Sequence, residues 1–66
     1  MKYSDDPVAR MLLARAVYLE SMSNCLDMLA STLREKDKHV AADSIIYAVR
    51  EQRFEAMLVR GQLAAW

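Results

Sequence analysis

The sequence predicts an all-α fold in which two antiparallel helices form a hairpin, and two hairpins associate as a homodimeric four-helix bundle. Three observations predict it. Leucine recurs at every seventh position from 12 to 33, six polar residues then interrupt the apolar pattern at 34–39, and heptad-like spacing resumes beyond them. A chain of 66 residues forms a single domain, here 1–66.

The first helix is predicted over residues 7–35. Asp6 is a suitable N-cap, and Pro7 then occupies the first helical position, where its missing N–H costs nothing. Leucines at seven-residue spacing and the half-heptad positions between them form an a/d seam. The members of this seam are Val8, Leu12, Leu19, Met22, Leu26, Leu29 and Leu33.

The second helix is predicted over residues 39–63, after the polar loop. Asp37 is a candidate N-cap for it. Gly61 either ends this helix, or the last turn continues and places Leu63. Apolar residues return at heptad-like spacing, with Gln52 as the polar exception, at positions Ala42, Ile45, Val49, Ala56, Val59, Leu63 and Trp66. Because no Gly or Pro marks the loop, one continuous helix is the rival interpretation.

A hairpin this small needs further burial to be stable. A chain of this length buries only roughly 60% of the surface that its unfolded form exposes. Cys25 is the only cysteine, so an intrachain disulfide is excluded, and oligomerisation remains. The residues expected in the homodimer core are Leu12, Leu19, Met22, Leu26, Leu29, Leu33, Ile45, Val49 and Val59.

Both helices carry apolar residues outside their seams. In the second helix, Tyr47, Phe54 and Leu58 are spaced by seven and four residues, on the face opposite Val49. Two interpretations stay open: this surface belongs to the dimer core, or it docks onto a different protein, since aromatic and arginine residues dominate interface energetics. The residues assigned to a partner or second interface are Leu13, Val17, Tyr47, Arg50, Arg53, Phe54, Met57 and Leu58.

No residue pattern indicates catalysis, a cofactor or a metal. His39 lies in the polar loop, where a lone histidine is usually solvated and able to contact a helix end such as Glu35. Cys25 has no basic neighbour in sequence that would activate its thiol, and buried cysteines behave as small hydrophobes. One Cys and one His do not supply the four ligands of a structural zinc site. We therefore expect a non-enzymatic protein.

Arg15 occupies a seam position where an apolar residue is expected. A buried unpaired arginine is costly, so its side chain either reaches solvent or pairs with an acid such as Asp43, Glu51 or Glu55. A polar residue at a seam position can also fix register or partner choice. Both interpretations stay open.

Charge and targeting signals limit the partners. Nine basic residues balance nine acidic ones, which disfavours a protein that binds mainly phosphate backbones. A nucleic-acid-binding dimer using Arg50, Arg53 and Arg60 remains the alternative, together with a structural subunit of a larger helical assembly. The N-terminus lacks a signal-peptide pattern, and the longest apolar stretch, 11–19, is about half of a ~20-residue membrane span. We expect a cytoplasmic regulator, inhibitor or accessory subunit that binds another protein.

Overall fold

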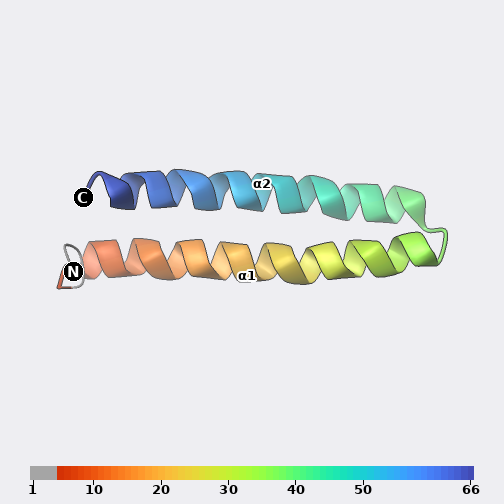
Figure 1. The fold of residues 1–66 in the computed structure, drawn as a ribbon, viewed down its shortest axis with the longest axis horizontal. Coiled ribbons are helices and arrows are strands. Elements are labelled where there is room, and N and C mark those ends of the chain that lie inside the picture. Colours follow the sequence, from red (N-terminus) through yellow and green to blue (C-terminus); the bar gives the residue numbers. More distant parts are fainter. Residues whose placement is uncertain (1–4) are drawn as a thin grey trace.

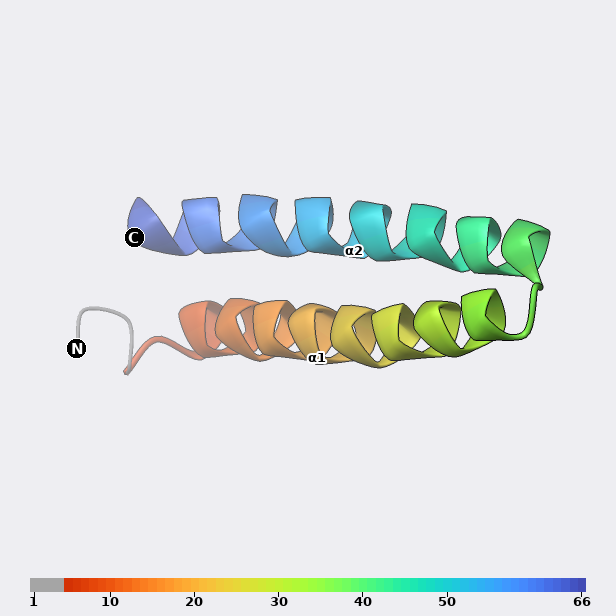
Figure 2. The ribbon, with the colours of Figure 1, turned by 45° about the vertical axis from the view of Figure 1, so that its right-hand side comes forward.

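The computed structural model describes residues 5–66, so the first four residues of the predicted domain lie outside the described part of the chain. Two helices, α1 (Pro7–Glu35) and α2 (His39–Ala64), pack against each other as an antiparallel hairpin (Figures 1 and 2). The molecule measures 48 × 14 × 13 Å, and the start of α1 and the end of α2 lie at the same end of it (Figure 1). The all-α hairpin prediction is confirmed, and the continuous helix is wrong.

The start of α1 follows the predicted chemistry. Asp6 is the N-cap, and its Oδ1 accepts hydrogen bonds from the backbone N–H groups of Val8 at 2.9 Å and Ala9 at 3.4 Å. Pro7 begins the helix. The other carboxylate oxygen of Asp6 accepts a hydrogen bond from the indole Nε1 of Trp66 at 3.0 Å. One carboxylate therefore caps α1 and ties the last residue of the chain to it.

The turn between the helices is a Schellman motif without glycine. The backbone N–H of Lys38 donates to the Leu33 carbonyl at 2.8 Å, and that of Asp37 donates to the Arg34 carbonyl at 3.0 Å. Asp37 adopts a positive φ of 60°, a conformation that Asp tolerates better than most side chains. The prediction that Asp37 caps α2 is wrong: its backbone reverses the chain, Lys38 is the N-cap, and no side chain of residues 5–66 caps α2.

The end of α2 settles the choice left open at Gly61. The helix runs through Gly61 to Ala64, one residue beyond the predicted end. The additional turn buries Leu63. Apolar burial at this position therefore outweighs the tendency of glycine to end a helix.

The seam between the helices differs from the predicted one in the half-heptad row of α1. The leucine row takes part as expected, with Leu19 buried and the other leucines half-buried. The second row that α1 contributes to the seam is not formed by Val8, Met22 and Leu29. It is formed by small residues one position later in the heptad, which we call the small-residue row. This row is fully buried and consists of Ala9, Ala16, Ser23 and Ala30. Small side chains let two helices approach closely, so a lone pair of helices buries this row and leaves the larger one outside.

The helix α2 also contributes one buried row to the seam. The buried row of α2 consists of Ala42, Val49, Ala56 and Leu63. Ion pairs from Arg15 to Glu55 and from Glu20 to Arg60 link the two helices and show their register. In this register Ser23 and Gln52 lie level with each other, near the middle of both helices. The centre of the hairpin core is therefore polar.

Candidate interaction surfaces

The hairpin has two broad sides that differ in chemistry. On the side that we call the charged face, cross-helix contacts between polar groups follow one another along the seam. Glu20 binds Arg60 through two hydrogen bonds of 2.5 and 2.7 Å. Arg53 lies 3.7 Å from Asp27 and donates to the Asn24 side-chain oxygen at 3.3 Å. These contacts fasten α1 to α2 along one edge.

A third ion pair extends the charged face toward the turn. Arg34 lies 3.7 Å from Asp43. The side chains of both residues are at least half exposed. Water therefore screens their attraction, and the pair contributes little stability. We read the charged face as a set of cross-links that fix the register of the hairpin.

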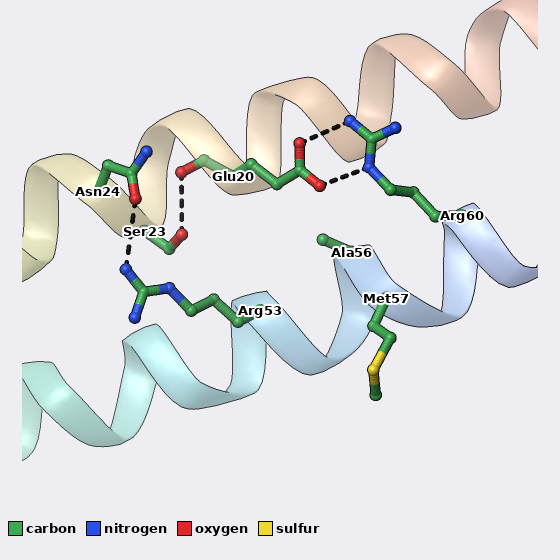
Figure 3. Close-up of a pocket in the computed structure, with 7 residues that line it drawn as sticks. All are labelled: Glu20, Ser23, Asn24, Arg53, Ala56, Met57 and Arg60. Atoms are coloured by element: carbon green, nitrogen blue, oxygen red, sulfur yellow. Dashed lines mark hydrogen bonds and ion pairs between the residues drawn. The ribbon is translucent and has the colours of Figure 1, made fainter.

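A shallow groove of about 530 Å³ opens in this face. Figure 3 shows the Glu20–Arg60 pair at one end of it and the Asn24–Arg53 hydrogen bond at the other. Small residues of the seam form its floor, and the Ser23 hydroxyl donates to the Glu20 carbonyl at 2.9 Å. The polar groups along the groove satisfy one another.

The electrostatics of the groove favour the ionised pair. The hydrogen bond from Arg60 holds the pKa of Glu20 below its usual value, although partial desolvation opposes the shift and the positive charge of Arg60 adds to it. A carboxylate held by a bidentate guanidinium is a stabilising contact, not a general base. The groove therefore supports no catalytic assignment.

The other side, which we call the apolar face, has one ion pair among residues 5–66, Arg15 with Glu55. Helical periodicity places it beside the leucine row, whereas the small-residue row borders the charged face. Most of its side chains are apolar and exposed or half-buried. From α1 they are Val8, Met11, Tyr18, Met22, Cys25 and Leu29, and from α2 they are Ala41, Ala48 and Leu58.

A third surface lies along the outer side of α2. Tyr47, Phe54 and Leu58 are 66%, 58% and 53% exposed, which confirms that they point away from the hairpin seam. We call Tyr47 and Phe54 the outer aromatic pair. Leu58 lies between this pair and the apolar face. The prediction that this stripe contacts a partner stays a prediction.

The residues predicted for the dimer core divide into two groups. Leu19, Val49 and Val59 are buried within the single hairpin. The remaining six keep part of their surface exposed, and Leu29 is 47% exposed. These six are Leu12, Met22, Leu26, Leu29, Leu33 and Ile45. Their assignment to a dimer core stays a prediction.

The residues predicted for a second interface lie on neighbouring surfaces of the hairpin. Leu13, Val17, Arg50, Arg53 and Met57 lie on the side of the charged face, and helical spacing places Arg50 and Met57 next to the outer aromatic pair. Leu13 is half-buried beside the seam, whereas Met57 is 61% exposed and points away from α1 (Figure 3). On α2 the basic part of the predicted interface therefore adjoins its aromatic part, and the assignment of these residues to an interface stays a prediction.

Arg15 pairs with Glu55, one of the three acids considered for it. Its side chain remains more than half exposed, so it both reaches solvent and pairs with an acid, and a role in fixing register or partner choice stays a prediction. His39 lies 3.6 Å from Asp37, rather than contacting Glu35, and is exposed. Cys25 is exposed as well. Over residues 5–66 no three His, Cys, Asp or Glu side chains cluster as metal ligands would.

Sequence reasoning missed the polar layer at the centre of the hairpin. Ser23 is fully buried, and the side-chain oxygen of Gln52 is buried without a hydrogen-bond partner within the described chain. The signal was available: Ala9, Ser23 and Ala30 belong to a seven-residue repeat of small residues, and Gln52 interrupts the apolar row that faces it.

Comparisons with protein-family models, curated proteins and solved structures found no match to the chain. Neither helix of the described region is long and apolar enough to cross a membrane.

Proposed function

We propose that this chain is a homodimeric helical hairpin that acts by binding another protein, as a regulator, inhibitor or accessory subunit. The observation that carries the proposal is the amount of large apolar side chain left outside the hairpin. Soluble monomers rarely expose extensive apolar patches unless these patches bind something. The exposed examples include Met11, Tyr18, Met28, Val40, Tyr47, Phe54, Met57 and Leu58, each more than half exposed.

The energetic scale of this exposure is large for so small a chain. Tyr47 and Phe54 leave roughly 100 Å² of apolar surface each in water, and covering both would contribute about 5 kcal/mol at about 25 cal/mol per Å². That approaches the whole stability of a small domain. Association is the physical process that recovers this free energy.

The charged groups support a protein partner over a nucleic acid. Arg53 and Arg60, two of the three arginines along α2, are engaged by Asp27 and Glu20. Binding phosphates would require these contacts to break. The exposed thiol of Cys25 is compatible with a reducing compartment. We therefore propose that the protein acts in the cytoplasm.

A pull-down from a lysate, compared between variants, tests the function. The tagged chain is expected to capture specific proteins, and the double variant Tyr47→Ala, Phe54→Ala is expected to lose them while remaining helical by circular dichroism. Met28→Ala is the matched control, because Met28 is 72% exposed on the outer side of α1. If the double variant retains the same captured proteins, the outer aromatic pair is not the contact surface.

A further inference from the structure

The buried oxygen of Gln52 is the strongest sign that the hairpin is incomplete. Its Oε1 has no hydrogen-bond partner among the described residues, and a buried acceptor without a donor costs about 1–3 kcal/mol. Gln52 lies near the midpoint of α2. It belongs to the seam row that borders the apolar face, not to the row that borders the charged face.

Burial along the seam is asymmetric in the same direction. Every residue of the two rows beside the charged face is buried, Ala9 to Ala30 in α1 and Ala42 to Leu63 in α2. On the other side, most of the row beside the apolar face is only half-buried, including Leu12, Leu26 and Ile45. The core is therefore closed toward the charged face and open toward the apolar face.

We infer that a second copy of this chain covers the apolar face, and that the Gln52 amides of the two copies hydrogen-bond to each other at the centre of the resulting four-helix bundle. This inference deepens the proposed function and rests on its homodimer. A primary amide both donates and accepts, so two related by a twofold axis satisfy each other. A twofold axis parallel to the helices places the symmetry mate of Gln52 at the same level of the bundle.

The size of the apolar face suits such a dimer. A face of 48 by 14 Å corresponds to roughly 700 Å² per copy, close to the about 800 Å² per partner of a standard stable interface. The face combines half-buried leucines at its centre with exposed methionine and tyrosine at its edge. That arrangement provides an apolar interface core surrounded by adaptable side chains.

The two halves of the apolar face are complementary to each other. The α1 half is bulky and carries Arg15, whereas the α2 half has the small residues Ala41 and Ala48 and carries Glu55. A twofold axis parallel to the helices places the α1 half of each copy on the α2 half of the other. Bulky side chains then meet small ones, and each Arg15 lies between two glutamates. All neighbouring helices are antiparallel in this arrangement.

This dimer separates the two interaction roles of the chain. The charged face and the outer aromatic pair remain on the outside, one set on each copy. The outer aromatic pair is then the surface left for a different protein. The dimer consequently presents two equivalent partner sites.

Solution mass and the reactivity of Cys25 test the inference together. The native chain is expected at twice its 7.5 kDa mass by light scattering. Met22→Glu, which places a charge in the apolar face, is expected at the single-chain mass. Met57→Glu is the matched control on the charged face and is expected to stay dimeric. Modification of Cys25 by a thiol reagent is expected to be at least threefold slower in the native chain than in Met22→Glu.

The native protein provides a readout that does not depend on a variant folding. Dilution below the dimer dissociation constant is expected to accelerate Cys25 modification by the same threefold or more. The inference is overturned if the chain is a dimer, Cys25 reacts at one rate at every concentration, and Met22→Glu leaves the dimer mass unchanged. That result would leave the homodimer of the proposed function standing. A native chain at the single-chain mass at high concentration overturns both.

A disulfide test checks the orientation. In the proposed arrangement Cys25 lies level with Glu51 of the second copy, so Glu51→Cys is expected to oxidise to a covalent dimer, visible by non-reducing electrophoresis. The native chain, oxidised alongside, is expected to remain uncrosslinked because its two Cys25 residues lie on diagonal helices. Efficient crosslinking of the native dimer through Cys25 alone would place α1 against α1 and overturn the arrangement.

Discussion

The small-residue row of α1 makes a quantitative prediction about stability. Replacing Ala16 by Leu inserts a large side chain at a seam position that is 0% exposed, level with Val59 in the register that the ion pairs show. No solvent-facing direction is open to it, so the helices must separate or the leucine must leave its preferred rotamer. Overpacking of this kind costs about 1–3 kcal/mol.

The expected result is a large fall in melting temperature. For a domain of about this size, each 1 kcal/mol shifts the melting temperature by about 4–8 °C, so Ala16→Leu is expected to melt about 5–20 °C below the native chain. Thermal unfolding followed by far-ultraviolet circular dichroism measures it. All variants are compared at one protein concentration, because association makes the melting temperature concentration-dependent.

Ala14→Leu is the matched control, since Ala14 is exposed on the same helix and the substitution is chemically identical. It is expected to melt within about 3 °C of the native chain, because surface substitutions change stability by about 0.5 kcal/mol or less. If Ala16→Leu melts as high as Ala14→Leu, or higher, the helices do not need small side chains at this row. Close approach of the two helices would then not explain why the small-residue row is buried.

Three further predictions concern the groove, the turn and the polar layer. Arg60 lowers the pKa of Glu20 in the folded chain, so the pair stabilises the fold above the ordinary glutamate range and loses this effect as pH falls through the lowered pKa. The melting temperature of Glu20→Gln is therefore expected to fall less steeply than that of the native chain between about pH 6 and 3. Asp37→Val is expected to destabilise the fold by about 1–2 kcal/mol, since a β-branched residue resists the positive φ, whereas Asp37→Gly is expected to be neutral or slightly stabilising in the same urea titration. Gln52→Leu is expected to keep or raise the melting temperature, because it replaces both amides of the proposed pair by apolar side chains at once; a lower melting temperature would show that the amide is essential to the core.

The sequence predicted the helices well because their ends depend on local chemistry. Asp6 and Pro7 act within one turn, and both bounds of α1 agree with the prediction. The turn was harder to predict. It depends on a left-handed Asp37, and a sequence without glycine in the loop gives no direct signal of that backbone conformation.

The choice of seam could not be predicted from amphipathicity alone. The leucine row is shared by two candidate stripes, one completed by Val8, Met22 and Leu29 and the other by the small residues next to them. Hydrophobicity favours the first stripe, and close helix approach favours the second. Distinguishing them requires knowing how near the two helices lie, which is a property of the pair and not of either helix. The same ambiguity is why the predicted dimer core includes residues that the single hairpin buries.

The bond between Trp66 and Asp6 has a spectroscopic consequence. Trp66 is the only tryptophan in the chain, and its indole binds the carboxylate that caps α1, at the end opposite the turn. Its emission therefore reports the opening of that end alone, whereas circular dichroism averages over both helices. Comparing the two signals during denaturation distinguishes fraying of the chain ends from loss of the whole hairpin, without any introduced label.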